Sequence, residues 1–408
     1  MNIECFANVH CSLFNVHLSG LPDLSEVTHV QNSKYRIRLL IVLALCFSLT
    51  RVWSAAELPA QLTDEVFWQL VTEFSEPSGR FPSDNFVSNE LATQRVLSEL
   101  TKSRKASGAY VGVGPEQNFT YIVALQPKIA FIVDIRRQNM IQHLMYKALI
   151  ELSSDRADFL SRLFSRPRPS NVDKNSGIGA LFDALSPIQA DQQMFDENLR
   201  AIKDRLIKEH GFKLTSEDET TLGYIFRAFY VGGPDLGYSN VAFQPRSAGP
   251  RLLPTYEELM IDTDENGQQR SFIATEENFL TLQQFEKDNL IVPVVGNFAG
   301  STALRSVGSY LREHNTLISA FYTSNVEQYL FMTSEDWKNF YTNVSTLPLD
   351  SNSTFIRPLI NTGNGYTASP QFRPTFHWDT VLFPIADLVA AFNAGMIENY
   401  YDVIQTRN

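Results

Sequence analysis

Three short stretches of the sequence place glycine or polar side chains directly after a run of apolar residues. In the first, Gly112 and Gly114 follow the run AYV, and Asp134 ends a second apolar run about 20 residues later. Glycine at a strand end permits positive φ and lets the backbone approach a ligand closely. A carboxylate at the end of the next strand accepts hydrogen bonds from ribose hydroxyls in nucleotide-binding α/β units. This spacing predicts a nucleotide-type ligand site.

The glycine pattern of this stretch is incomplete. A full dinucleotide fingerprint reads G-x-G-x-x-G, whereas the loop here reads GVGPEQN and has no third glycine. Glu116 lies in the same loop and would repel a pyrophosphate, so a neutral or cationic adenosyl ligand fits better than a dinucleotide. The alternative is a tight strand-to-helix turn in which Asp134 caps the helix that begins near Gln138.

The second and third stretches are VVGNFAG and AFYTSNVEQYL. Asn297 in the second could hydrogen-bond a base or an amide, or it could cap the next helix. In the third, Tyr322, Ser324 and Asn325 follow an apolar run, so they are candidates for holding and polarising a substrate. The alternative is that Ser324 and Asn325 cap a helix and that Glu327 completes a capping box.

These stretches need a scaffold that brings their ends together. Short apolar runs rich in Val, Ile and Phe predict buried strands at AYVGV, KIAFIVD, NLIVPVVG, TLISAFY, STFIRPL and FHWDTVLF. Periodic segments such as QNMIQHLMYKALIELS and STALRSVGSYLREH predict helices between them, and ELATQRVLSELTKS predicts a further helix with Ser88 as its N-cap.

The alternation of strands and helices predicts an α/β, Rossmann-like fold with a mainly parallel sheet. Residues 165–285 are richer in turns and polar residues and are expected to form a largely helical insertion. Ligands in such folds bind beyond the carboxyl ends of the strands. All three stretches are therefore expected to meet at one edge of the sheet.

The composition excludes several kinds of partner and of chemical site. The net charge is -11, and residues 1–56 carry one more basic than acidic side chain, so the rest of the chain is more acidic than the whole. An acidic body repels phosphate backbones, so we expect no nucleic-acid partner. All three cysteines, Cys5, Cys11 and Cys46, precede this body, which excludes thiolate nucleophiles and cysteine zinc sites from it. The histidines have no metal-ligand spacing, and we expect no metal.

The N-terminal region has the pattern of a targeting segment. Lys34, Arg36 and Arg38 precede an apolar segment at about residues 39–50, and the small residues Ser54-Ala55-Ala56 follow it. This order predicts a secretory signal peptide, or an uncleaved membrane anchor as the alternative. The domain organisation expected is an N-terminal extension over residues 1–56 and one domain over 57–408. The body is then exported, to a periplasm or the cell exterior, or membrane-anchored, with membrane contact only through the apolar segment.

GVGPEQNFTYI, FIVDIRRQN, IVPVVGNFAG and FYTSNVEQYL resemble the sequence blocks of an uncharacterised bacterial protein family. That family is in turn similar to class I S-adenosylmethionine-dependent methyltransferases, and the resemblance covers about residues 58–360. It implies a methyltransferase-like protein that binds S-adenosylmethionine and acts on an unknown substrate. S-adenosylmethionine is a cytosolic metabolite, so the alternative is an exported, non-catalytic protein that binds a small ligand on the same scaffold.

The resemblance also implies roles for the residues singled out above. Gly112 and Gly114 would line the methionine end of the cofactor, and Asp134 would hold its ribose. Asn297 would lie near the adenine. Tyr322, Ser324 and Asn325 would stand at the strand end that carries the catalytic groups.

Overall fold

The computed structural model describes residues 57–102, 108–238, 253–360 and 378–405. The chain divides between Ser54 and Ala55, and every described residue belongs to the second unit. The predicted leader and its apolar segment at about residues 39–50 lie outside the described residues. Among the described helices, none has the length and apolarity required to span a bilayer.

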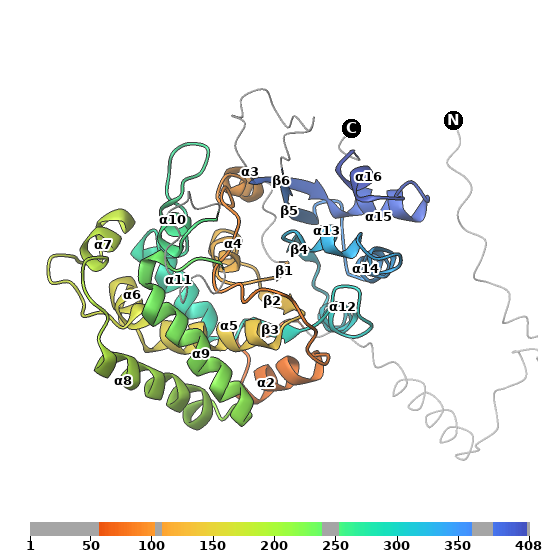
Figure 1. Ribbon diagram of the computed structural model, residues 1–408. Coiled ribbons are helices and arrows are strands. Elements are labelled where there is room, and N and C mark those ends of the chain that lie inside the picture. The colour runs from red at the N-terminus through yellow and green to blue at the C-terminus, as the bar shows by residue number, and fades with distance from the viewer. Residues whose placement is uncertain (1–56, 103–107, 239–252, 361–377, 406–408) are drawn as a thin grey trace, which may run out of the picture. The chain divides into compact units, whose positions relative to one another are not determined.

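A six-stranded sheet forms the centre of the fold, with the order β3-β2-β1-β4-β5-β6 (Figure 1). The strands are β1 (Ala109–Gly112), β2 (Ile129–Asp134), β3 (Ile291–Val295), β4 (Ile318–Tyr322), β5 (Thr354–Ile360) and β6 (Trp378–Pro384). The first five pair in parallel, and β6 pairs with β5 in antiparallel orientation. Each strand coincides with one of the predicted apolar runs, so the Rossmann-like fold with a mainly parallel sheet is confirmed.

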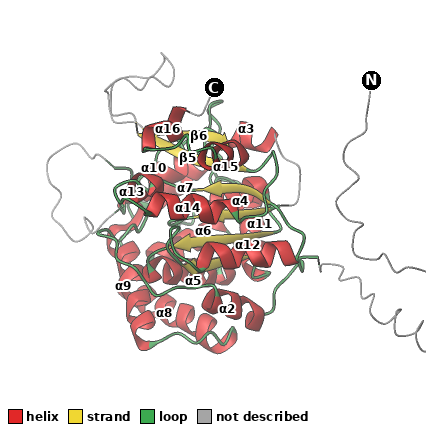
Figure 2. Ribbon diagram, turned by 90° about the vertical axis from the view of Figure 1, so that its right-hand side faces the viewer, coloured by secondary structure: helices red, strands yellow, loops and turns green. Residues whose placement is uncertain are grey.

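Helices cover both faces of this sheet (Figures 1 and 2). On one face lie α12, α14 and α15, and on the other lie α4, α5 and α11. Every residue of β1, β2 and β3 is buried as a result. The helices outside the stretch between β2 and β3 are α2 (Asp64–Glu73), α3 (Leu97–Lys102), α4 (Gln117–Leu125), α12 (Ala303–Glu313), α13 (Val326–Leu330), α14 (Asp336–Ser345), α15 (Ile385–Asn393) and α16 (Tyr400–Gln405).

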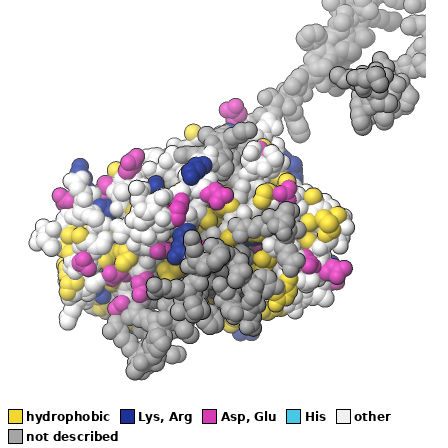
Figure 3. All heavy atoms as spheres, turned by 90° about the horizontal axis from the view of Figure 1, so that it is seen from above, with side chains coloured by type: hydrophobic (Ala, Val, Ile, Leu, Met, Phe, Trp, Pro, Cys, Tyr) yellow, Lys and Arg dark blue, Asp and Glu magenta, His cyan; other side chains and the backbone are white. Residues whose placement is uncertain are grey.

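The stretch between β2 and β3 is helical. It holds α5 (Arg137–Leu152), α6 (Arg156–Phe164), α7 (Ile178–Leu185), α8 (Gln192–Lys203), the π-helical turn η1 (Asp204–Glu209), α9 (Ser216–Gly232), the 3-10 turn η2 (Gly233–Asp235), α10 (Tyr256–Ile261) and α11 (Glu276–Lys287). The largely helical insertion predicted over residues 165–285 is confirmed for its described part. On the face seen in Figure 3, acidic and basic side chains of the described residues are interspersed.

The helix predicted from ELATQRVLSELTKS is wrong over its first half. Only Leu97–Lys102 is α-helical, and Ala92 has φ of 69°. Ser88 does not cap a helix; its hydroxyl accepts the backbone N–H of Glu90 at 3.1 Å. Glu90 is fully buried and is hydrogen-bonded to the side chains of Tyr322, at the end of β4, and Ser324, and these distant contacts override the local helical pattern.

Candidate functional site

A cavity of about 380 Å³ opens at the carboxyl ends of β1 to β4. Its lining includes Gly114, Asp134, Asn297, Ser324 and Asn325, which come from all three predicted stretches. The cavity lies between β1 and β4, where connections leave toward opposite faces, which is the switch point at which open α/β sheets bind ligands. Its volume is within the usual range for small-molecule sites.

The glycine loop after β1 is held by Asn118. The Asn118 amide donates to the carbonyls of residues 113–115 at 2.8–3.1 Å, and its oxygen accepts the Tyr110 hydroxyl at 2.8 Å. A Cβ on Gly112 would overlap the Asn118 oxygen and lie 2.8 Å from the Tyr110 ring, so this glycine serves close packing beneath the loop. Of the two glycines in this loop, Gly114, with φ of 79°, lines the cavity.

Gly112→Ala is expected to lower the free energy of unfolding by about 1–3 kcal/mol, because the added methyl group would push Asn118 and Tyr110 out of a filled interior. Urea denaturation measures the loss. The matched control is Gly179→Ala in α7, where a Cβ would meet no atom within 4 Å. An unchanged midpoint for Gly112→Ala would contradict the packing role.

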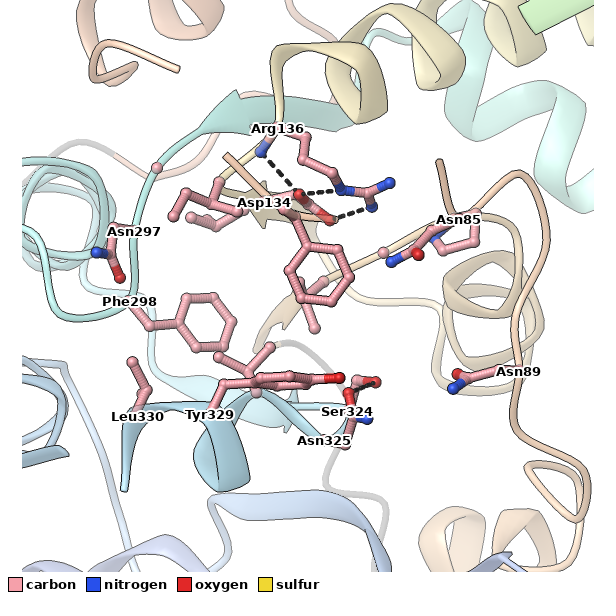
Figure 4. A pocket seen from close by; sticks show the side chains of 18 of the residues that line it. Asn85, Asn89, Asp134, Arg136, Asn297, Phe298, Ser324, Asn325, Tyr329 and Leu330 are labelled. Atoms are coloured by element: carbon pink, nitrogen blue, oxygen red, sulfur yellow. Dashed lines mark hydrogen bonds and ion pairs between the residues drawn. The ribbon is translucent and has the colours of Figure 1, made fainter. Parts of the chain in front are cut away.

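Asp134, at the end of β2, forms an ion pair with Arg136 (Figure 4). One carboxylate oxygen accepts the Arg136 backbone N–H at 2.9 Å and Nε–H at 3.0 Å, and the other accepts Nη2–H at 2.8 Å. Three of the roughly four acceptor positions of the carboxylate are thereby used. The alternative in which Asp134 caps α5 is wrong, because the N-cap residue is Arg136 and no side-chain cap bond is present. A ligand hydroxyl here would meet a neutral pair rather than a free carboxylate.

The loop after β3 is held by Glu76. Its carboxylate accepts the backbone N–H groups of Asn297 at 3.1 Å, Thr302 at 2.7 Å and Ala303 at 3.0 Å. The Asn297 side-chain oxygen accepts the N–H of Ala299 at 3.0 Å, so Asn297 closes its own turn and does not cap α12. This arrangement holds Asn297 in the cavity wall (Figure 4).

The turn after β4 brings Ser324 against a buried carboxyl group. Ser324 has φ of 47°, and its hydroxyl donates to one oxygen of Glu90. The Tyr322 hydroxyl donates to the other Glu90 oxygen at 2.5 Å. Burial raises the pKa of Glu90 to about 7, against the opposing effect of the two hydroxyl hydrogen bonds. Ser324 lines the cavity, whereas Tyr322 is fully buried and does not.

The capping box predicted for this turn is wrong. Asn325 is the N-cap residue of α13 but makes no side-chain cap bond. Glu327 instead points into the interior, where it pairs with Arg357 at 2.5 Å and accepts the Tyr341 hydroxyl at 2.6 Å. A buried arginine on β5 therefore draws Glu327 away from the helix end and fixes the start of α13.

Glu116 is also buried and does not line the cavity. Its Oε1 accepts the Ser88 N–H at 3.0 Å, its Oε2 has no partner, and burial raises its pKa to about 7. His143 lies near the same loop, with Nε2 2.9 Å from the Gly114 carbonyl oxygen, and burial lowers its pKa to about 4. Near neutral pH the base of the loop thus carries an uncharged His143 and a Glu116 carboxyl group that titrates in that range.

Aromatic lining residues were missed by the sequence reasoning. Phe298 and Tyr329 stand inside VVGNFAG and AFYTSNVEQYL, so their position beside Asn297 and Asn325 was a usable signal. Phe81 had no local signal: its ring packs edge-on against Tyr329 at 5.3 Å and beneath the Arg136 guanidinium at 5.9 Å. These rings give the cavity flat apolar walls on which a base could stack. No three His, Cys, Asp or Glu side chains of the described ranges gather as a metal site would require.

Comparison with known proteins gives one family. Two overlapping matches to its model cover residues 85–206 and 168–383, and the family is described as a domain of unknown function, DUF7790. No curated protein matches the chain. The matched residues include β1 to β5 and most of the cavity lining, but they begin after Glu76 and Phe81.

Proposed function

Since the chain belongs to the DUF7790 family, whose function is unknown, its activity has to be inferred from its site, and we propose an S-adenosylmethionine-dependent, methyltransferase-like protein with an unknown substrate. One observation carries the proposal. Gly114 after β1 and Asp134 at the end of β2 line the same cavity, at the switch point of a Rossmann-like sheet. This is the position in which such sheets hold the sugar and backbone of a nucleoside ligand.

The charges of the lining favour an adenosyl ligand over a dinucleotide. The charged residues among the lining are Arg80, Asp134, Arg136 and Asp336, two of each sign. Arg136 is already paired with Asp134, so its charge is not available to a pyrophosphate. A neutral thioether or a sulfonium cation carries no negative charge that the protein would have to neutralise. Phe298 and Phe81 supply apolar wall for the adenine.

Methyl transfer requires few catalytic groups from the protein. The enzyme has to place a nucleophile against an electrophilic methyl group, and correct positioning supplies much of the rate. Ser324, Asn325 and Asn89 lie across the cavity from Asp134 and could orient an acceptor there (Figure 4). The proposal therefore needs neither a thiolate nor a metal.

A second candidate function is favoured by the pairing of Asp134. Because Arg136 occupies most of its acceptor positions, the carboxylate has limited capacity for two ribose hydroxyls. This favours a non-catalytic protein that binds a different small ligand in the same cavity. An exported body, as the leader predicts, would also be separated from cytosolic S-adenosylmethionine.

Calorimetric titration of the full chain distinguishes the two. We expect micromolar binding of S-adenosylmethionine and S-adenosylhomocysteine, and weaker binding of NAD⁺ as the dinucleotide probe. Asp134→Asn should weaken both adenosyl ligands by about tenfold or more, because a charge-assisted hydrogen bond to the ribose is lost. Asp196→Asn, at an exposed position of α8, is the matched control. Absence of binding by the wild type, or equal affinity of Asp134→Asn and the wild type, would contradict the adenosyl proposal.

A further inference from the structure

The backbone at Ser324 is in an unusual conformation for a residue with a side chain. Ser324 stands two residues after β4, on the turn into α13, and has φ of 47°. A left-handed conformation at a non-glycine residue costs free energy and persists only where the surroundings enforce it. In hydrolases with a nucleophile elbow, a strained strand-to-helix turn of this kind exposes a serine hydroxyl above a parallel sheet. The sequence around Ser324 lacks the GxSxG pattern, so only the geometry reveals the likeness.

The partner of this serine is a carboxyl group without a counterion. Both oxygens of Glu90 accept hydroxyl hydrogen bonds, one from Ser324 and one from Tyr322. In the described part of the chain Glu90 forms no ion pair, and its side chain is fully buried. A carboxylate in such surroundings has a raised proton affinity, and its pKa of about 7 matches the requirement for a general base at neutral pH.

One member of the pair faces the cavity, and the other lies in the protein interior. Ser324 lines the cavity, whereas Glu90 lies behind it in the protein interior. The side-chain amides of Asn89 and Asn325 line the cavity near Ser324 (Figure 4). Asn325 Oδ1 lies 3.4 Å from Ser324 Oγ, and the amide N–H groups of Asn325 and Asn89 are those available to donate to an oxygen that gains negative charge.

We propose that Ser324 and Glu90 form a nucleophile–base pair that hydrolyses small neutral carboxylic esters bound in the cavity. The class follows from the lining: its two acidic and two basic residues give it no formal net charge, so a neutral substrate suits it, and its apolar walls suit a short acyl chain. This activity goes beyond the adenosyl site, because it uses the side of the cavity opposite Asp134.

The reaction needs only the ester and water. Ser324 Oγ attacks the carbonyl carbon, its proton passes to Glu90, and the carbonyl π electrons move to the oxygen facing the amide donors. The intermediate collapses with cleavage of the C–O bond, and the departing alkoxide takes the proton from Glu90. Water then attacks the acyl-serine in the same manner, gives its proton to Glu90, and releases the carboxylic acid while Ser324 regains a proton.

A fluorophosphonate probe tests the pair without any knowledge of the natural substrate. We expect the full-length wild type to be labelled at Ser324, as located by peptide mass spectrometry, and to hydrolyse p-nitrophenyl acetate. Glu90→Gln keeps the shape of the side chain but removes the base, and the hydroxyl that faces the new NH2 group has to turn and accept a hydrogen bond. Both rates should therefore fall at least about a hundredfold. Glu286→Gln is the matched control, since Glu286 is another buried carboxyl group with a raised pKa, on α11 outside the cavity. Its labelling should equal that of the wild type.

The pH profile supplies a readout that a purely structural role would not move. Wild-type labelling should rise as pH increases through neutrality and level off once Glu90 is ionised. Tyr322→Phe removes a hydrogen bond that lowers the Glu90 pKa, so its profile should shift to higher pH. The proposal is overturned if Ser324 stays unlabelled, if Glu90→Gln is labelled as fast as wild type, or if the profile is flat. If Glu90→Gln fails to fold, as judged by circular dichroism, the wild-type and Tyr322→Phe profiles decide. None of these measurements uses S-adenosylmethionine, so a negative result here is independent of the adenosyl proposal.

Discussion

Arg357→Met is expected to lower the free energy of unfolding by about 3–5 kcal/mol. Arg357 and Glu327 are both buried, at 3% exposure each, and their charged atoms lie 2.5 Å apart. Removal of the arginine leaves the carboxylate of Glu327 in the interior with hydroxyl partners only. It also removes the contacts of the guanidinium with the rings of Phe355 and Phe383, at 4.7 and 5.1 Å.

Urea unfolding with linear extrapolation measures this loss. The double variant Arg357→Met, Glu327→Gln should recover most of it, because no uncompensated charge remains buried. Arg227→Met on an exposed position of α9 serves as the control and should change stability by less than about 0.5 kcal/mol. If the single and double variants are equally unstable, the loss comes from packing and not from the ion pair.

The second large effect concerns pH: stability should fall by on the order of 3 kcal/mol as pH rises from about 6.5 to about 8. Burial raises the pKa of Glu90 and Glu116 to about 7 and that of Glu286 to about 8. Between the unfolded and folded pKa values the native state binds more protons than the unfolded chain. Stability is therefore largest at low pH and is lost until the folded pKa is passed, at about 1.4 kcal/mol per pH unit for each group.

Two histidines with shifted pKa values also make the stability depend on pH. The pKa of His143 is lowered to about 4, so His143 reduces stability only as pH falls below its ordinary value of about 6.5. Despite burial, hydrogen bonds to the carboxylates of Glu151 and Asp64 raise the pKa of His210, and its contribution to stability is also lost as pH rises. Above about pH 6.5, His143 thus has no further effect, and His210 and the three buried carboxyl groups change stability in the same direction.

Glu286→Gln isolates the largest of these contributions. Glutamine is neutral at every pH, so this variant should gain about 2 kcal/mol on the wild type between about pH 6.5 and about pH 8. Urea unfolding at the two pH values measures the difference. Glu65→Gln, at an exposed position of α2, should follow the wild type at both. A wild type whose stability is constant or rises over this range would contradict the assignment.

The sequence predicted the sheet because its strands carry a local signal. Parallel strands buried on both faces must be continuous apolar runs, and KIAFIVD and NLIVPVVG are of this kind. The convergence of Gly114, Asp134, Asn297 and Ser324 on one cavity then follows from geometry, because all parallel strands end at the same edge.

The partners of these residues could not be predicted. Glu90 lies in a segment with helical periodicity, and the residues that bury it are 232 and 234 positions away in the sequence. Arg136 is only two positions from Asp134 in the sequence, but this spacing does not reveal whether its side chain turns back to the carboxylate or away from it. Pairings of this kind depend on tertiary packing, which single-sequence patterns do not encode.

The long-range hydrogen bonds that Glu76 accepts from the loop after β3 bear on the order in which parts of the protein fold. Glu76 leaves the ribosome well before its partners, since its bond to Thr302 spans 226 positions. Contacts between such distant positions close late, because the chain between them must first be ordered. Early in synthesis the residues that will wall the cavity are therefore exposed, and a nascent chain that ends before β4 contains Glu76 and Glu90 but neither Ser324 nor Asn325. The wall of the cavity is thus completed among the last steps of folding.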